Sequence, residues 1–171
     1  MTKTQFDIVL AAMKILMVAA ELAPYAKTGG LADMVHALAR KLCTLGEDVR
    51  VLMPLHGCVA ECWRREMRPL PGIFSIHLGQ EHWARVHELL ESSGLRVYFL
   101  EYHKFFGREH PYDDGYRAYE DNPQRYAFLS RAAIDLADFL DWTPDIFHVH
   151  DWMAAPVPVY LETVARNGRL R

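Results

Sequence analysis

Four consecutive segments near the N-terminus constrain the fold more than any other feature. Residues Met13–Ala19 form a short apolar run without turn residues, which is typical of a buried strand. After a loop that contains glycine, Leu31–Leu45 carries apolar residues at the spacing of an amphipathic helix, and Gly46 follows as its stop. Asp48–Met53 is a second strand candidate, ended by Pro54. This order predicts a βαβ unit with a right-handed crossover.

The rest of the chain continues with elements of the same two kinds. Further strands are predicted at Ile73–His77, Trp83–Leu89, Leu95–Leu100 and Ile146–His150. A helix is predicted through Leu140, with Asn122 as its cap and Pro123 at its first position, and another helix between Ala154 and Ala165. Between them, residues 103–121 have the composition of a loop, and a loop of this length indicates function or mobility.

These elements predict an α/β fold, a Rossmann-like, open and mostly parallel sheet with helices on both faces. A chain of 171 residues has the size of one domain with a hydrophobic core. We expect residues 13–171 to form that domain. Met13 would be a natural start, so we interpret residues 1–12 as an N-terminal extension.

Composition excludes several classes of function. Nineteen Lys and Arg face 22 Asp and Glu, so we expect no nucleic-acid partner. The apolar runs are too short to span a bilayer, and Asp7 interrupts the only candidate core of a signal peptide. Three cysteines, an odd number, argue against a disulfide framework. We therefore expect a cytoplasmic protein with reduced thiols and no membrane association.

Two loops lie where an open parallel sheet binds ligands, beyond the carboxyl ends of its strands. The first is Lys27-Thr28-Gly29-Gly30, which precedes a predicted helix. Glycines let a ligand approach the backbone, helix N-terminal N–H groups attract anions, and a lysine adds a charge suited to phosphate. The segment matches neither the dinucleotide fingerprint nor a P-loop, so a plain glycine-rich turn with a solvated lysine remains an alternative.

The second loop follows the last predicted strand as His148-Val149-His150-Asp151-Trp152. Strand alternation places His148 and His150 on one face. Two histidines without a third ligand make a weak metal site, and we expect no metal. Asp151 is better interpreted as a carboxylate that a polar substrate can reach at the strand end. It could also cap the next helix, and the two roles are compatible.

Together these segments resemble the bacterial glycogen synthase and plant starch synthase family, which uses ADP-glucose. The resemblance runs from Met13 to the end of the chain and is most specific in the order of KTGGLAD and HDW. The matching residues are Lys14–Glu21, Lys27–Asp33, Val51–Pro54, Pro111–Tyr112, Tyr119–Asn122, Arg125–Phe128 and His148–Trp152.

The resemblance implies the N-terminal half of a GT-B fold, in which two Rossmann-like domains face each other across a cleft. Such enzymes transfer glucose from ADP-glucose to the non-reducing end of an α-1,4-glucan with retention, without a cofactor or metal. By analogy, Lys27, Gly29 and Gly30 would bind the donor phosphates. Asp151 would act as the catalytic carboxylate on the transferred glucose, and Tyr112 and His150 would contact sugar.

The chain departs from the family pattern in two ways. Met153 stands where the family usually has a second histidine, so a polar contact is lost there unless the position tolerates apolar residues. The family also continues beyond the position of Arg171 with a strand ending in His-Asn and a second, C-terminal domain. The 171-residue chain alone is therefore expected to be inactive, and an uncovered apolar face would favour self-association.

Two other functions remain open at this point. One is a non-catalytic half-domain that binds glucan or a partner protein while keeping the fold. The other is an unrelated Rossmann-type nucleotide-binding protein, against which the paired KTGG and HDW loops argue. The donor's base lies beyond what this half of a GT-B fold would contact.

Overall fold

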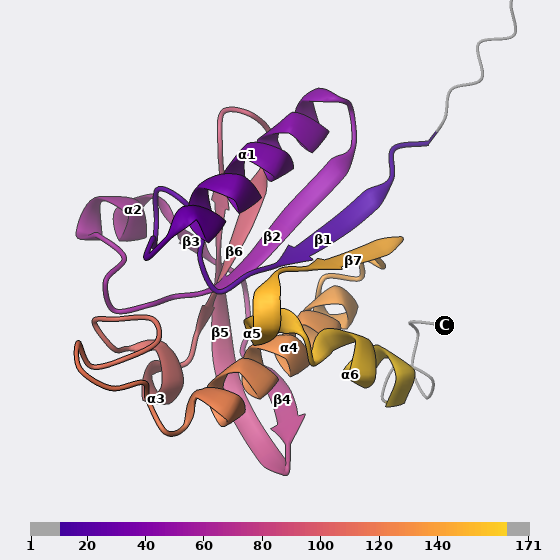
Figure 1. Cartoon of the computed structure of the whole chain (residues 1–171). Helices are drawn as coiled ribbons and strands as arrows, with labels where there is room; N and C mark the ends of the chain where they lie inside the picture. Colours follow the sequence, from indigo (N-terminus) through magenta and orange to yellow (C-terminus); the bar gives the residue numbers. More distant parts are fainter. Residues whose placement is uncertain (1–10, 164–171) are drawn as a thin grey trace, which may run out of the picture.

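One seven-stranded sheet organises the protein, as a computed structural model describing residues 11–163 shows (Figure 1). The strand order is β3-β5-β6-β2-β1-β7, and β4 pairs with β5 outside that path. The strands are β1 (Lys14–Val18), β2 (Asp48–Pro54), β3 (Arg68–Pro69), β4 (Phe74–Leu78), β5 (Gln80–Leu90), β6 (Arg96–Glu101) and β7 (Ile146–Val149).

Helices cover both faces of this sheet. In Figure 1, α1 lies over one face, while α4 and α6 lie over the other. The helices are α1 (Gly30–Thr44), α2 (Glu61–Glu66), α3 (His103–Phe106), α4 (Asn122–Phe139), α5 (Asp151–Ala154) and α6 (Val157–Thr163). The predicted fold class is thereby confirmed.

Strand direction divides the sheet into two parts. The pairs β1–β2, β1–β7 and β2–β6 are parallel, with Leu16 opposite Arg50 on one side and Phe147 on the other. The pairs that involve β5 are all antiparallel. Because β1, β2 and β7 run in one direction, their carboxyl ends meet at one edge of the sheet, where a ligand site is expected.

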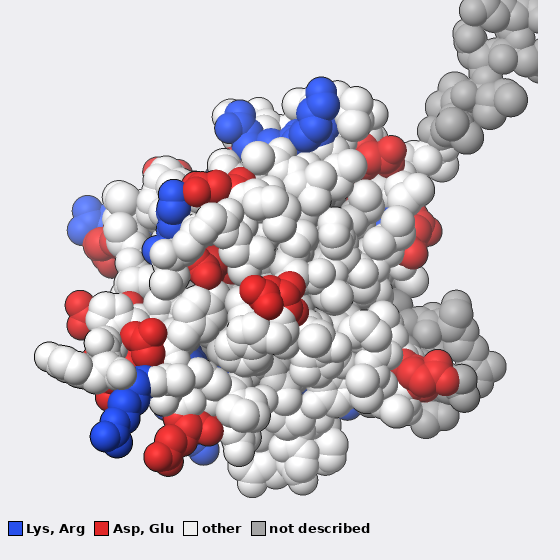
Figure 2. All heavy atoms as spheres, viewed as in Figure 1, with Lys and Arg blue, Asp and Glu red and all other residues white. Residues whose placement is uncertain are grey.

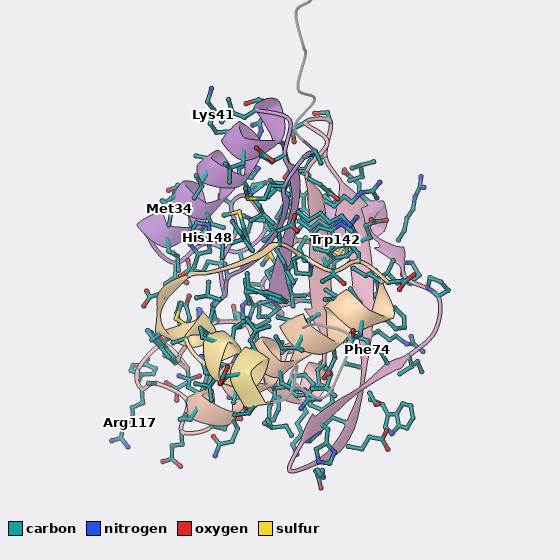
Figure 3. The ribbon with its side chains drawn as sticks, turned by 90° about the vertical axis from the view of Figure 1, so that its right-hand side faces the viewer. Met34, Lys41, Phe74, Arg117, Trp142 and His148 are labelled. Carbon is teal, nitrogen blue, oxygen red and sulfur yellow. The ribbon has the colours of Figure 1, made fainter. Side chains whose placement is uncertain are left out.

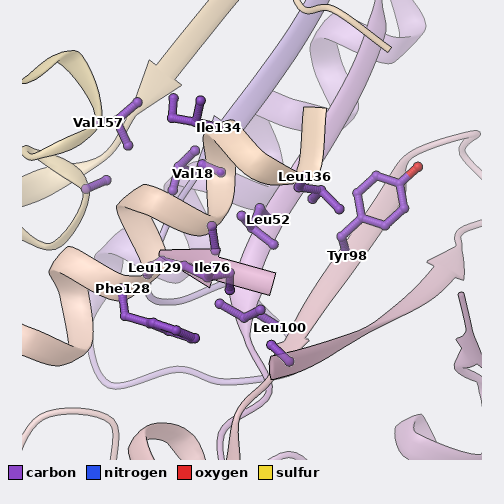
Figure 4. Close-up of a cluster of buried hydrophobic side chains, with 14 of the residues drawn as sticks. Val18, Leu52, Ile76, Tyr98, Leu100, Phe128, Leu129, Ile134, Leu136 and Val157 are labelled. Carbon is purple, nitrogen blue, oxygen red and sulfur yellow. The ribbon is translucent and has the colours of Figure 1, made fainter. Parts of the chain in front are cut away.

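Two hydrophobic cores, one on each face, hold the layers together. The core under α4 and α6 contains Val18, Leu52, Leu100, Phe128 and Val157, all buried and drawn in Figure 4. The core under α1 includes, among others, Met17, Val35, Val51 and Phe99. Alternate residues of β1 and β2 therefore enter opposite cores, which explains why β1 after Lys14 and β2 after Arg50 are continuously apolar.

Several local predictions need correction. The predicted cap of α4 is wrong, because Asn122 is already helical and the residue before the helix is Asp121, whose side chain forms no cap hydrogen bond. The helix predicted between Ala154 and Ala165 is present as α6, which begins at Val157. The short elements α2, β3, α3 and α5 were not predicted. Residues 1–10 of the predicted extension, and the predicted helix end at Ala165, lie outside the described residues.

Charged side chains of both signs are interspersed on the face that Figure 2 displays. The basic residues at its upper edge belong to the C-terminal end of α1, where Arg40 and Lys41 are exposed. Figure 3 shows Met34 and Lys41 on the outer side of α1, away from the sheet. This side of α1 is therefore a solvent-facing surface of the domain.

Candidate functional site

A cavity of about 300 Å³ lies at the carboxyl edge of the parallel strands. It is formed where the ends of β1 and β7, the N-terminus of α1 and the loop before α4 come together. Its walls are Glu21, Thr28, Gly29, Gly30, Leu31, Tyr112, Asp151, Trp152 and Met153. Four of the sequence-predicted site residues, Gly29, Gly30, Tyr112 and Asp151, are thus brought together by the fold.

Glu21 is the central polar residue of this cavity. It follows β1 at the carboxyl edge and is only 3% exposed. Its Oε2 accepts hydrogen bonds from the backbone N–H groups of Thr28 and, over 3.1 Å, of Gly29. Its Oε1 accepts a hydrogen bond from the Tyr112 hydroxyl over 2.5 Å. One carboxylate therefore ties three separate segments of the wall together.

The glycine loop presents open backbone to the cavity. Gly29 precedes α1 with an extended backbone (φ −141°, ψ −162°), so it carries no strain. A β-carbon added at Gly29 or Gly30 would meet nothing within 4 Å. The first N–H groups of a helix have no partner within the helix and carry partial positive charge. This end of α1 can therefore accept an anionic group close to the backbone.

Lys27 lies just outside the cavity wall. Its Nζ is 2.6 Å from Oδ2 of Asp33, and both side chains are about half exposed, at 53% and 55%. Exposed ion pairs of this kind contribute little to stability. The ammonium group is consequently free to exchange Asp33 for another anion near the glycine loop.

Tyr112 is held from behind by the start of α4. The Asn122 amide donates to the Tyr112 carbonyl over 2.8 Å. The Arg125 guanidinium and the Tyr126 hydroxyl both donate to the carbonyl of Pro111, over 2.9 and 2.8 Å. Burial and the bond to Glu21 raise the pKa of the Tyr112 phenol well above its usual range. The phenol is therefore a protonated donor held in a fixed place.

Arg125 is an unusual residue for the interior because it is completely buried and forms no salt bridge with any described residue. It donates to the carbonyl of Phe105 over 2.7 Å and to Oδ1 of Asn122 over 2.6 Å. Its guanidinium also lies 4.9 Å from the ring centroid of Tyr119. Carbonyl and aromatic partners thus stabilise this charge in place of a carboxylate.

Asp151 occupies the turn between β7 and α5. Its φ of +61° lies in the left-handed region, which aspartate tolerates better than most residues. Its Oδ1 accepts a hydrogen bond from the N–H of Trp152, over 2.6 Å. The residue before α5 is His150, so the alternative role of Asp151 as the cap residue is wrong. The exposed carboxylate faces the cavity instead.

His148 in β7 and His150 directly after it lie on one face, as the alternation predicted. Their rings stack with centroids 4.4 Å apart. His150 is 5% exposed and does not line the cavity, and its Nε2 has no hydrogen-bond partner among the described residues. Burial, with a smaller effect of His148, lowers the pKa of His150 to about 4. Contact between His150 and a sugar stays a prediction.

Trp152 and Met153 complete the wall beside Asp151. Trp152 is 51% exposed, and its ring packs edge-on against Tyr126 with centroids 5.1 Å apart. Met153 is 2% exposed and belongs to the hydrophobic core, while its carbonyl accepts a hydrogen bond from Ser130. An apolar side chain is thus well accommodated at position 153.

No cluster that could hold a metal ion is present within residues 11–163, counting groups of at least three His, Cys, Asp or Glu side chains. Sequence reasoning missed Glu21 and Trp152 as parts of the site. The signal for Glu21 was its position directly after β1, where parallel strands deliver ligand-binding residues. Trp152 had the same signal after β7.

The family model described as "Starch synthase catalytic domain" matches residues 14–171 of the chain. The chain belongs to this family. Among curated members, it is 42% identical over 161 residues to Glycogen synthase 1 of Geobacter sulfurreducens. It is 41% identical over 162 residues to Glycogen synthase of Treponema denticola. These alignments cover 92% and 93% of this chain and 32% of each relative.

A solved structure from the same family has a similar fold. The catalytic domain of Starch Synthase IV from Arabidopsis thaliana, bound to ADP and acarbose, superimposes with a TM-score of 0.80 at 30% sequence identity. The match covers 92% of this chain and 32% of that one. The starch synthase family chain described here thus spans about a third of the length of its relatives. Within residues 11–163 we find no helix with the length and apolarity that a membrane crossing requires.

Proposed function

We propose that this chain is the N-terminal domain of a retaining glucosyltransferase that transfers glucose from ADP-glucose to the non-reducing end of an α-1,4-glucan. The observation that carries the proposal is the cavity at the carboxyl edge, which joins the helix N-terminus at Gly29 and Gly30 to the exposed carboxylate of Asp151. Family membership supports the reaction class. The ADP and acarbose of the related starch synthase IV structure support the two substrate classes.

Each part of the cavity would have a distinct role. The donor phosphates would lie against Gly29 and Gly30, where helix N–H groups favour negative charge, and Lys27 would leave Asp33 to join them. Asp151 would accept a hydrogen bond from a hydroxyl of the transferred glucose. Tyr112, and His150 from beneath the surface, would contact or shape the sugar pocket.

The chemistry proposed here needs no cofactor. The leaving diphosphate carries negative charge that the protein's positive groups must balance, and a preorganised helix N-terminus with a lysine can begin to do so. Most of a transferase's rate comes from positioning the reactants out of water. The 171-residue chain, which corresponds to 32% of its relatives, is therefore proposed to be inactive alone, and its place in the cell is proposed to be the cytoplasm.

A chimera tests the proposal directly. The 161-residue matching segment of Glycogen synthase 1 of Geobacter sulfurreducens is replaced by this chain, and transfer of labelled glucose from ADP-glucose to glycogen is measured. We expect activity in the chimera, and none in the 171-residue chain. Asp151→Asn should lower kcat about 100-fold or more, because it removes a charge beside the reacting sugar.

Two comparisons sharpen this test. Lys27→Met should raise the KM for ADP-glucose, whereas Lys41→Met, an exposed lysine on the outer side of α1, should leave it unchanged. UDP-glucose in place of ADP-glucose shows whether the adenine matters. A chimera that folds, binds glycogen and transfers no glucose would overturn the proposal and favour a non-catalytic glucan-binding domain.

A further inference from the structure

The outer face of β5 carries an exposed tryptophan that the proposed active site does not use. Along β5, His82, Ala84 and Val86 are buried, and the residues between them point to the opposite side. Trp83 on that side is 62% exposed, and among the exposed large hydrophobic residues that the structure describes only Tyr116 and Leu45 are more exposed. An indole left in solvent on a rigid hairpin is available for a ligand.

Trp83 borders a shallow hollow of about 240 Å³. None of the residues lining this hollow lines the cavity at the carboxyl edge. They come from the residue before β4, from β5, from the end of β6 and from the start of α3: Ile73, Trp83, Ala84, Arg85, Glu101, Tyr102 and His103. The hollow is thus a separate surface of the domain, centred on the neighbouring strands β5 and β6.

The residues that line the hollow are held firmly in place. Tyr102 is anchored on the buried side of the sheet, where its hydroxyl shares a 2.9 Å hydrogen bond with Nδ1 of His82 and its ring packs on Phe128, with ring centroids 4.6 Å apart. Arg85 and Glu101 are direct cross-strand partners in the β5–β6 ladder. A binding surface that is held in this way loses little conformational entropy when a ligand binds.

The polar groups around Trp83 match a neutral ligand rich in hydroxyl groups. The Arg85 guanidinium offers donors, and the Glu101 carboxylate, which accepts from His87 through Oε2 over 2.7 Å, offers Oε1 as an acceptor. One positive and one negative charge on directly paired residues give no net attraction for phosphate or for another polyanion. A sugar ring instead has an apolar C–H face for the indole and a rim of hydroxyls for these side chains.

We propose that this hollow, with Trp83 as its platform, is a second binding site for an α-glucan chain. The proposal rests on the proposed function only for the choice of glucan as ligand. A glucan polymer has many segments, so a weak contact at Trp83 would raise the effective concentration of chain ends near the cavity at the carboxyl edge. The site would thus retain the polymer without taking part in the transfer.

The indole N–H resonances of the 171-residue chain test this site with maltoheptaose as the probe. Trp63, Trp83, Trp142 and Trp152 are the four tryptophans, and the indole of Trp142 donates to Asp48 in the interior, which makes it a reference. We expect maltoheptaose to shift the Trp83 resonance and leave that of Trp142 in place. Trp83→Ala, which also assigns the resonance, should weaken retention on immobilised glycogen about tenfold.

Matched variants separate the outcomes. Trp83→Phe keeps an aromatic plane and should retain most of the binding. Leu90→Ala changes a β5 residue that is 58% exposed but does not line the hollow, and it should leave binding unchanged. Binding that is lost with Trp152→Ala but kept with Trp83→Ala would overturn the proposal, as would an unshifted Trp83 resonance. So would a Trp83 shift that depends on protein concentration without glucan, because it would mark contact with a second copy of the chain.

Failure of this site and failure of the proposed function give different results. An inactive chimera with a maltoheptaose-induced Trp83 shift would remove the transferase function and keep the glucan site. An active chimera whose Trp83→Ala variant has the same KM for glycogen as the parent would keep the transferase function and remove this site.

Discussion

The Tyr112 hydroxyl donates a hydrogen bond to Oε1 of Glu21 over 2.5 Å, although the two residues are 91 positions apart in the sequence. The bond joins the loop before α4 to the end of β1. Because Glu21 also accepts from the backbone of the glycine loop, its carboxylate fixes that loop and Tyr112 relative to each other. The cavity is therefore preorganised before any substrate enters.

Glu21→Ala should destabilise the domain. The change leaves the N–H groups of Thr28 and Gly29 and the Tyr112 hydroxyl without their acceptor. Leaving buried donors unpaired is expected to lower the free energy of unfolding by about 1–3 kcal/mol, measured by urea denaturation. The exposed Glu120→Ala is the control, and equal midpoints for the two variants would contradict the role given to Glu21.

Tyr112→Phe should change how stability depends on alkaline pH. Burial and the carboxylate of Glu21 raise the pKa of Tyr112 in the folded state, whereas an unfolded tyrosine ionises near pH 10. The phenol's contribution is therefore complete below pH 10 and is lost as the pH rises above it, because the unfolded state releases the proton first. Urea denaturation between pH 9 and 11 should show a shallower decline for Tyr112→Phe than for wild type.

An equal decline in the free energy of unfolding of wild type and Tyr112→Phe between pH 9 and 11 would contradict this role of Tyr112. Tyr116→Phe is the matched control, because Tyr116 is 97% exposed. Its substitution should leave the alkaline decline unchanged.

The parts of the fold that follow from local pattern were predictable. β1 and β2 are apolar runs, and α1 has the spacing of an amphipathic helix, so the βαβ unit could be recognised. By contrast, α2 has six residues and none of them is buried, which leaves no periodicity to detect. β5 begins at Gln80, earlier than the predicted start at Trp83. Gln80 and Glu81 are polar and gave no strand signal in the sequence, but their pairing with β4 holds them in the strand.

The site was predictable where it depends on strand ends. Gly29, Gly30 and Asp151 follow the general position of ligand loops in parallel sheets, and all three line the cavity. The role of Glu21 was not predicted, because it depends on contacts with Thr28, Gly29 and the distant Tyr112 that only the tertiary fold creates. The buried role of Arg125 was not predicted, because arginine is rarely buried and only the tertiary fold supplies its carbonyl partners.

His150 should make the domain less stable in mild acid. Its pKa is about 4 in the folded state, because burial and the neighbouring His148 disfavour the charged ring, whereas an unfolded histidine titrates near 6.5. The unfolded state therefore binds the proton first as the pH falls. Its contribution to stability is complete above pH 6.5 and is lost between pH 6.5 and 4.

His150→Leu should flatten this pH dependence. Between pH 7 and 5, the wild type is expected to lose about 1–2 kcal/mol more than the variant in urea denaturation. His56 is also buried with a pKa of about 4, so both proteins should still lose some stability as the pH falls. The exposed His110→Leu should behave as wild type, and the idea fails if His150→Leu does so too.

Arg125 should be irreplaceable even by lysine. Its guanidinium donates in three directions at once, to the carbonyls of Phe105 and Pro111 and to Oδ1 of Asn122. A lysine ammonium is a point charge on a flexible stem and cannot reproduce this planar geometry. A buried lysine ammonium would therefore lack some of its hydrogen-bond partners, and at least one of the carbonyls of Phe105 and Pro111 would lose its donor. Arg125→Lys should therefore lower the free energy of unfolding by about 2 kcal/mol or more.

The same substitution should release the loop that carries Tyr112. Arg125 donates to the carbonyl of Pro111 and orients Asn122, which in turn donates to the carbonyl of Tyr112. Weakening these contacts should let residues 107–121 open more often. Limited trypsin digestion should cut this loop faster in Arg125→Lys than in wild type under conditions where both remain folded. Arg117→Lys, on the same loop and exposed, keeps the trypsin site and should cut as wild type does. Equal cleavage of all three proteins would mean that Arg125 supports the core without positioning Tyr112.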